Sequence, residues 1–341
     1  MKTYTVYHLT FNTQLHLGRS TGSAQKGNLG LEKTETYISA DTLFSSICQT
    51  WANFYDTASL TDFLKPYTTD NALLPFTLTS AFPFAHNVYC FPKPLTFQVM
   101  SKKSKRVQFV SNNIFRQIIN GNQPKFKEKN LINSEYVWIS PEEKKQLKKT
   151  MDEEICVWKT DTRPRVTIGS QNAGSEIWYV ETVEFNTNCG LWFAATFDSE
   201  ETKQKIDTLL RVMGDSGIGG EKNAGYGMFD FCNEDRIELP TAQIGDQFIT
   251  LSPICPKLEE QLTVLRTGKT AHALNTVNAP GKTNRKRIHL FSEGSVFHKS
   301  EEQIGCLVDL KPDTSAIPKY RYGFAWQVGI KGSENETEIS T

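Results

Sequence analysis

The sequence predicts an α+β fold with two domains, and three observations lead to that class. The chain has 341 residues and an ordinary apolar fraction of 38%, so two domains with cores of their own are expected. Its aromatic content of 11% favours β-rich packing. Runs with the period of a helix are interspersed with strand-like runs, so the class is mixed.

The first expected element is a strand over residues 4–17, where aromatic and branched side chains are dense. A polar, glycine-bearing loop over residues 18–30 follows it. His16 stands at the end of this strand, and Gly18 and Arg19 open the loop. We expect this loop beside the strand end to be a binding surface.

The second expected element is a helix that begins at Asp41. Leu43, Phe44, Ile47 and Trp51 recur every three or four residues, as on the buried face of a helix. By position Asp41 is expected to be the N-cap rather than a catalytic carboxylate. Ser39, two residues before it, is expected to belong to the turn.

A basic segment follows two proline-punctuated strands at residues 76–84 and 88–97. Between 101 and 130 a single acid, Glu128, stands against eight basic residues: Lys102, Lys103, Lys105, Arg106, Arg116, Lys125, Lys127 and Lys129. Interleaved phenylalanines could stack on bases while the lysines follow phosphates. Equally, the segment is a solvated insertion whose Phe109, Phe115 and Phe126 cover a neighbouring core.

Residues 141–154 are expected to form a surface helix with charges of both signs. Arg163 and Arg165 stand at the entry to an expected hairpin that returns over residues 177–185. A strand at 191–197 precedes a helix at 200–213, which Ser199 can cap and Gly214 can end. A β-α-loop-β order therefore surrounds the most unusual stretch of the chain.

That stretch is the glycine loop, residues 217–227, which reads GIGGEKNAGYG and holds five glycines in eleven residues. Glycine lets successive amides turn towards an anion at close range, so phosphate is the expected ligand. A P-loop and a dinucleotide-binding loop both lead from a strand into a helix. Here a helix precedes the loop, so neither of those motifs applies.

Four stretches together resemble a known family: residues 37–48 (YISADTLFSSIC), residues 163–168 (RPRVTI), the glycine loop, and residues 291–297 (FSEGSVF) with 322–325 (YGFA). The glycine loop is similar to that of the RAMP superfamily of CRISPR RNA-binding proteins. The ordered set resembles the fourth Csm subunit of type III-A CRISPR effector complexes, which caps the 5′ handle of the guide RNA (crRNA). The similarity covers almost the whole chain.

The resemblance implies two ferredoxin-like (RRM-like) domains with a thumb-like insertion in the first. We place the N-terminal domain at residues 1–180, with the basic insertion at about 101–175. The C-terminal domain is placed at residues 181–341 and carries the glycine loop. The resemblance also implies contacts with the large polymerase-like subunit, with the first backbone subunit, and with target RNA near the start of the guide.

From these considerations we predict a non-catalytic RNA-binding site, in which loop amides and Lys222 hold phosphates and Tyr226 supports a base. The predicted RNA-binding residues are His16, Gly18, Arg19, Ser39, Arg106, Arg163, Arg165, Gly217, Ile218, Gly219, Gly220, Lys222, Asn223, Gly225, Tyr226, Arg285 and Lys286.

Two other functions remain open. A guide-processing endoribonuclease would use a histidine as general acid or base. The candidates are His8, His16, His86, His272, His289 and His298. None has a convincing partner set in the sequence, and His16 is expected instead to contact RNA. A scaffold that binds only protein is the second alternative.

Composition adds further expectations. Lysine plus arginine equals aspartate plus glutamate, 38 each, so any basic surface must be local. The seven cysteines are scattered without a Cys-x-x-Cys pair, and we expect no metal and no cofactor. The chain enters a β-rich run directly after Met1 and has no apolar stretch long enough to span a bilayer. A cytoplasmic location without membrane contact is expected.

Overall fold

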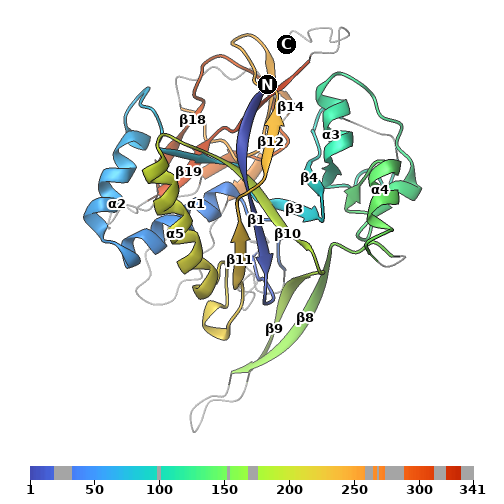
Figure 1. The fold of residues 1–341 in the computed structure, drawn as a ribbon, viewed down its shortest axis with the longest axis horizontal. Coiled ribbons are helices and arrows are strands. Elements are labelled where there is room, and N and C mark those ends of the chain that lie inside the picture. Colours follow the sequence, from blue (N-terminus) through green and yellow to red (C-terminus); the bar gives the residue numbers. More distant parts are fainter. Residues whose placement is uncertain are drawn as a thin grey trace.

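The computed structural model describes most of the chain: residues 1–18, 33–97, 101–151, 154–167, 176–257, 264–266, 269–272, 288–310 and 320–331. These residues form a mixed α+β fold with several sheets (Figure 1). The predicted α+β class is confirmed. In the described part of the chain, no helix is both long and apolar enough to cross a membrane.

The largest sheet has ten strands and is built around β1 (Lys2–Phe11). On one side β1 pairs antiparallel with β10 (Cys189–Phe197). On its other side it pairs with β11 (Phe229–Cys232) and β12 (Arg236–Leu239). On its far edge β10 pairs with β2 (Phe76–Leu78) and with β3 (Phe82–Ala85), and the sheet continues from β3 to β4 (Val88–Pro92). From there it continues into β5 (Phe109–Ser111), β7 (Val137–Trp138) and β6 (Leu131–Ile132).

Three helices lie together to the left of this sheet in Figure 1: α1 (Ala40–Phe54), α2 (Thr57–Leu64) and α5 (Glu200–Ser216). The predicted periodicity of α1 is confirmed, because its apolar residues are buried. Its predicted cap is wrong, since Ser39 is the N-cap and Asp41 lies inside the first turn. Asp41 is 2% exposed and forms an ion pair with Arg321.

Helix α5 begins as predicted, because the Ser199 hydroxyl accepts a hydrogen bond of 3.1 Å from the amide of Thr202. The predicted end at Gly214 is wrong, and the helix continues to Ser216. A Cβ atom at Gly214 would lie 2.3 Å from the carbonyl oxygen of Phe229. Glycine at this position therefore allows close packing of α5 on β11 and does not end the helix.

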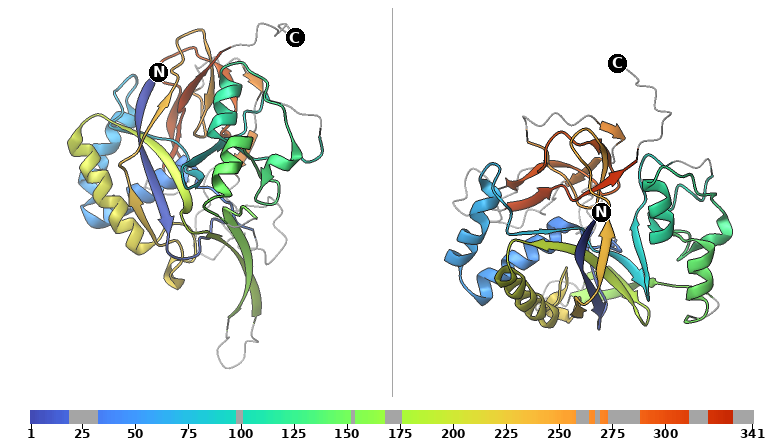
Figure 2. Two further views of the ribbon diagram at one scale, coloured as in Figure 1. Left: turned by 45° about the vertical axis from the view of Figure 1, so that its right-hand side comes forward. Right: turned by 45° about the horizontal axis from the view of Figure 1, so that its top comes forward.

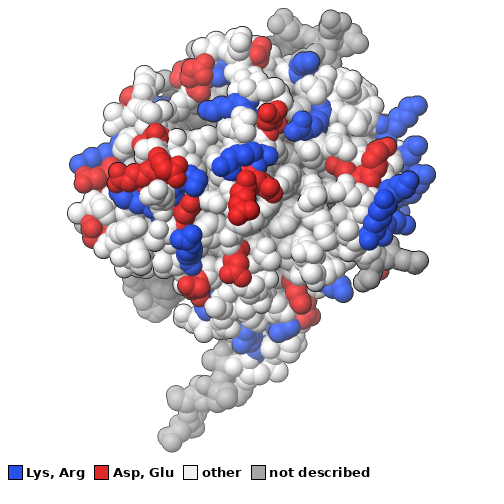
Figure 3. Space-filling view, in the orientation of Figure 1, with Lys and Arg blue, Asp and Glu red and all other residues white. Residues whose placement is uncertain are grey.

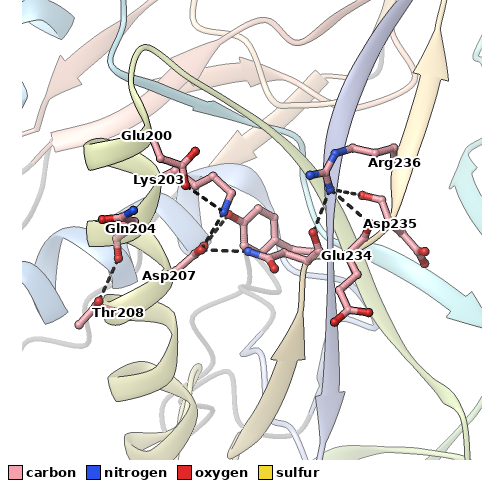
Figure 4. A network of polar contacts seen from close by, with 10 residues as sticks. Glu200, Lys203, Gln204, Asp207, Thr208, Glu234, Asp235 and Arg236 are labelled. Carbon is pink, nitrogen blue, oxygen red and sulfur yellow. Dashed lines mark hydrogen bonds and ion pairs between the residues drawn. The ribbon is translucent and has the colours of Figure 1, made fainter.

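Asp207 fixes α5 against the sheet (Figure 4). Its carboxylate accepts hydrogen bonds from the Tyr7 hydroxyl (2.6 Å), the Lys203 ammonium (3.1 Å) and the Asn233 amide (3.0 Å). Arg236 closes the neighbouring turn by donating to the carbonyl of Asp235 over 2.8 Å. Burial and the hydrogen bond to Asp207 raise the pKa of Tyr7 well above its ordinary value. The glycine loop thus starts from a fixed position beside β1.

The basic segment folds as a compact lobe on the other side of the sheet, to the right in Figure 1. It contains β5 (Phe109–Ser111), α3 (Asn112–Ile119), β6 (Leu131–Ile132), β7 (Val137–Trp138) and α4 (Pro141–Leu147). β5 extends the large sheet by pairing with β4. Phe109 and Phe115 are buried, and Phe126 packs 5.2 Å from Trp138. The interpretation that these rings cover a core is therefore correct.

A two-stranded ribbon projects from the body of the protein (Figures 1 and 2). It consists of β8 (Trp158–Thr167) and β9 (Glu176–Phe185), which pair antiparallel. The predicted hairpin at the RPR motif is thereby confirmed. The range 101–175, where an insertion is predicted, contains the packed lobe and β8, one of the two strands of the ribbon.

The C-terminal part is formed by strands in the described residues. One sheet joins β13 (Gln247–Thr250), β14 (Val264–Arg266), β17 (Val296–His298) and β20 (Gln327–Ile330). The C-terminal part also contains two separate two-stranded sheets. One pairs β15 (Lys269–His272) with β16 (Ile288–Phe291), and the other pairs β18 (Gly305–Asp309) with β19 (Tyr320–Phe324).

The large sheet crosses the boundary that we placed at residue 180, because β10, β11 and β12 pair with β1 or lie beside it in one sheet. The larger buried cluster is also shared: it includes Val6 and Leu9 of β1 together with Phe324 and Val328. The glycine loop is consequently built onto the N-terminal strand, not into a separate C-terminal unit.

Candidate nucleic-acid interface

The glycine loop docks on the chain that leaves β1. The amide of Gly220 donates to the carbonyl of His16 over 2.8 Å, and that of Gly227 donates to the carbonyl of Gln14 over 2.8 Å. The amide of Met228 donates to the Thr13 hydroxyl over 3.0 Å. These bonds hold both arms of the loop against the segment 13–16.

The neck of the loop requires two of its glycines. The amide of Ile218 donates to the carbonyl of Gly227 over 2.9 Å, which draws the arms together. A Cβ at Gly227 would lie 2.0 Å from the carbonyl oxygen of Ile218, and one at Gly217 would lie 2.3 Å from that of Tyr226. Both residues also have positive φ angles. Self-packing of the loop, not ligand approach, demands glycine here.

The tip of the loop is free of such packing. Glu221 has a left-handed conformation (φ 58°) and leads into a short 3-10 turn, η3 (Lys222–Ala224). Within the described residues, the amides of Glu221, Lys222 and Asn223 have no hydrogen-bond acceptor. A Cβ at Gly225 would meet nothing within 4 Å. Successive unpaired amides around a left-handed residue form the type of concavity that binds anions.

The charge of Lys222 is available at this tip. Its side chain is half-buried, and no carboxylate of the described residues forms an ion pair with it. Asn223 beside it is exposed. The tip thus presents free amides, one ammonium and one carboxamide on the same turn.

His16 lies beside the loop, but its side chain is only 1% exposed. Its ring Nδ1 hydrogen-bonds the carbonyl of Glu181 over 2.7 Å. A Cβ at Gly220 would lie 2.8 Å from the ring, so the imidazole packs directly under the loop. We expected His16 to contact RNA; its buried ring instead supports the loop from below.

The ribbon reaches the loop through Arg165. Its Nη2 donates a hydrogen bond of 2.9 Å to the Tyr226 hydroxyl, and its guanidinium carbon lies 5.4 Å from the centroid of that ring. Arg163 precedes it on the same face of β8 and pairs with Asp161 over 3.0 Å. The RPR motif and the glycine loop, distant in sequence, thus share one surface.

Other predicted residues are placed elsewhere. Ile218 is fully buried in the core, so its side chain cannot meet a ligand at the surface. Arg106 lies in the lobe and pairs with Glu135 over 3.2 Å. Ser39 occupies the N-cap position of α1, but its hydroxyl makes no capping hydrogen bond and is buried without a partner among the described residues. Gly18 is exposed and forms an isolated antiparallel β-bridge with Thr34. Arg19, Arg285 and Lys286 lie outside the described residues.

Sequence reasoning missed several residues of the site. The backbone carbonyl of Gln14 and the hydroxyl of Thr13 accept hydrogen bonds that hold the C-terminal arm of the loop. Glu181 acts through its carbonyl on His16 and through its carboxylate, which accepts a bond of 2.8 Å from the amide of Thr34. No sequence pattern distinguishes such residues, because their role depends on which strand the loop meets.

A polar groove of about 760 Å³ lies at the base of the ribbon. Its walls include Lys33 and Thr34 from the N-terminal segment, Asn133 from the lobe, and Lys159 and Glu181 from the ribbon. It thus adjoins the residues that hold His16. In contrast, the described residues contain no group of three or more histidine, cysteine, aspartate or glutamate side chains that could hold a metal ion.

Comparison with known proteins identifies the family. The profile of the RAMP superfamily matches residues 8–230, which run from β1 through the glycine loop to β11. The chain belongs to the RAMP superfamily. The predicted family is thereby confirmed.

Two curated relatives carry the same name, "CRISPR system Cms protein Csm4". The protein of Thermococcus onnurineus (strain NA1) is 24% identical over 301 residues, which span 86% of this chain and 88% of the relative. The protein of Methanocaldococcus jannaschii is 19% identical over 264 residues, or 67% of this chain and 65% of the relative.

Solved structures share the fold of this RAMP protein. A chain in the Csm3-Csm4 subcomplex of the type III-A CRISPR-Cas interference complex matches with a TM-score of 0.68 at 16% identity, covering 96% of this chain and 100% of that one. A chain in the Csm1-Csm4 cassette in complex with pppApA matches with a TM-score of 0.59 at 15% identity, covering 97% and 98%.

Proposed function

We propose that this protein is the non-catalytic RNA-binding subunit of a type III-A CRISPR interference complex that caps the 5′ handle of the crRNA. The observation that carries the proposal is the glycine-loop tip, with three unpaired amides beside Lys222. A phosphate backbone is the ligand that such a tip accommodates without a specific base. Arg165, on the adjoining ribbon, adds positive charge beside it, whereas Arg163 is paired with Asp161.

The architecture supports the finer fold assignment. The strand order β11-β1-β10-β3, with α1 and α5 in the two connections, is the antiparallel order of a ferredoxin-like unit. We infer that this unit is the first ferredoxin-like domain, that the lobe and ribbon are its thumb-like insertion, and that the C-terminal strands belong to the second domain.

The proposed partners follow from the relatives. The matched solved structures are named as assemblies of Csm4 with Csm3 and with Csm1. We propose that this chain likewise bridges the large polymerase-like subunit and the first backbone subunit, and that the ribbon lies near target RNA at the start of the guide. A projecting two-stranded ribbon has the length to reach beyond its own subunit (Figure 2).

The decisive experiment is copurification. The whole complex is expressed with a tag on this chain, and the 5′ ends of the bound RNA are sequenced. We expect short RNA with one constant 5′ sequence. Lys222→Glu should reduce its amount, whereas Lys205→Glu should not, because Lys205 lies on α5 and is paired with Glu201. Absence of RNA from the complex would overturn the proposal.

The alternatives give other results. A guide-processing endoribonuclease would cleave labelled repeat RNA in the presence of a chelator, with loss of cleavage on replacement of a histidine. A protein-only scaffold would assemble normally and retain its partners when Lys222 and Arg165 are both replaced, without any change in bound RNA.

A further inference from the structure

A second basic surface lies on the lobe, away from the glycine loop. We call it the α4 lysine surface; it consists of Lys125, Lys127, Lys129, Lys144, Lys145, Lys148 and Lys149. All are exposed except Lys144, which is half-buried. The first three precede or lie in the 3-10 turn η2 (Glu128–Asn130), and the others lie on α4 or just after it.

One contact brings these two segments together. The Lys144 ammonium donates hydrogen bonds to the carbonyl of Lys129 and, over 3.5 Å, to that of Leu131. Burial lowers the pKa of Lys144, and the neighbouring charges of Lys148 and Lys129 lower it further. Like charges are therefore held close together across the two segments.

The positive charge of this surface is not neutralised within the described residues, where none of the seven lysines forms an ion pair. Glu142 at the start of α4 is exposed and forms no ion pair with these lysines in the described part of the chain. Three other nearby carboxylates have different partners. Glu143 is buried and caps α4 through Ser140, while Glu128 and Glu135 pair with Lys103. Asp152 and Glu153 lie outside the described residues. Figure 3 shows the result: blue side chains gather at the right-hand edge over α4, whereas red and blue alternate over α5.

The chemistry of this surface fits a phosphate backbone better than a protein. Protein interfaces are depleted in lysine and rely on buried aromatic or arginine anchors. Here the aromatic ring of the segment, Phe126, packs inwards against Trp138. A row of ammonium groups without exposed rings can neutralise phosphates but cannot stack on bases or read them.

We propose that the α4 lysine surface binds the phosphate backbone of a nucleic-acid segment other than the one held at the glycine loop, without base recognition. The two surfaces lie on opposite sides of the ribbon base in Figure 1, so one short segment does not cover both. The inference stands independently of the proposed handle-binding function.

The test uses the full-length protein with any copurifying RNA left in place. The variant is Lys145→Gln, Lys148→Gln and Lys149→Gln together; Lys144 is kept because it bonds the backbone. The matched control, Lys2→Gln, Lys65→Gln and Lys205→Gln, removes the same charge elsewhere. Binding of an unrelated single-stranded oligonucleotide, as RNA and as DNA, is measured from about 0.05 to 0.3 M salt.

We expect the variant to bind roughly 10- to 100-fold more weakly at about 0.1 M salt, with a log–log salt slope smaller by about 2. The control should keep both values, and both proteins should keep the same melting temperature and the same amount of copurifying RNA. The RNA and DNA arms decide which of the two polymers the surface prefers.

Three results would overturn the proposal. In the first, the variant and the control bind the oligonucleotide equally. In the second, binding of polyglutamate is measured in the same way, and the variant loses it but keeps its binding of nucleic acid, which indicates an acidic protein partner. Alternatively, the variant loses its copurifying RNA together with oligonucleotide binding, which makes the surface part of the first site.

Discussion

The guanidinium of Arg165 donates a hydrogen bond of 2.9 Å to the hydroxyl of Tyr226 and lies over its ring. This pair joins the ribbon to the glycine loop, two elements from separate stretches of the sequence. Tyr226 is 8% exposed, so its ring is held between the loop and the arginine. Arg165 thereby fixes the position of the ribbon beside the amides at the loop tip.

We expect Arg165→Ala to weaken RNA binding about five- to tenfold, because a cation beside the loop and its contact with Tyr226 are both lost, which costs about 1 kcal/mol. Tyr226→Phe keeps the ring and should cost less than about 1 kcal/mol. Filter binding of the RNA measures both. The control is Arg116→Ala in α3, which removes a half-buried arginine that bonds Asn112 over 3.0 Å. Equal effects of Arg165→Ala and Arg116→Ala would contradict the expectation.

Alanine at Gly227 and at Gly225 should have different effects. At Gly227 the new Cβ would lie 2.0 Å from the Ile218 carbonyl oxygen, at a φ of +76°, so we expect a loss of about 3–5 kcal/mol in unfolding free energy. At Gly225 the φ of +81° is the only obstacle, and the loss should be about 1–2 kcal/mol. Urea denaturation compares the two. Similar losses at both positions would show that the neck is not packed as described.

The buried ion pair between Asp41 and Arg321 joins α1 to the C-terminal strands. Asp41 also accepts a hydrogen bond of 3.2 Å from the amide of Tyr322. Asp41→Ala leaves Arg321 unpaired and should destabilise the protein by about 3–5 kcal/mol. The double variant Asp41→Leu with Arg321→Met should recover part of this loss, as measured by thermal unfolding. A double variant as unstable as the sum of the single changes would argue against coupling of the two charges.

Glu293 predicts a pH dependence of stability. Burial raises the pKa of its carboxyl group above the ordinary value of 4.5, although Ser80 and Tyr37 donate hydrogen bonds to it. The folded state therefore holds the proton of the Glu293 carboxyl group more tightly than the unfolded state does. The protonated carboxyl group makes its full contribution to the free energy of unfolding below pH 4.5, and this contribution is lost as the pH rises through the raised pKa.

Glu293→Gln should remove this decline, so the variant should gain stability relative to the native chain as the pH rises. Denaturant midpoints measured in steps from about pH 4.5 to pH 8 test this. The exposed Glu301 provides a matched control, since Glu301→Gln should leave the pH profile unchanged. A Glu293→Gln profile that runs parallel to that of the native chain would refute the role of this carboxyl group.

Local sequence patterns predict a large part of the fold. The period of apolar residues predicts α1, and Ser199 predicts the start of α5, because both signals depend on neighbours within a few residues. The order of helix, glycine loop and strand is also local, and it indicates the superfamily without further information. The ends of elements were less predictable: Gly214 continues a helix because of a strand fifteen residues further along, not because of its own propensity.

The sequence by itself determined that a glycine loop follows a helix, that basic residues gather between 101 and 130, and that the chain resembles RAMP proteins. Only the tertiary structure decided that the loop docks on the end of β1, which buries His16 beneath it. It also brought Arg165 to Tyr226 and Lys129 to Lys144. The physical reason is that strand pairing and side-chain burial depend on contacts between distant segments, and no local spacing in a single sequence encodes which segments will meet.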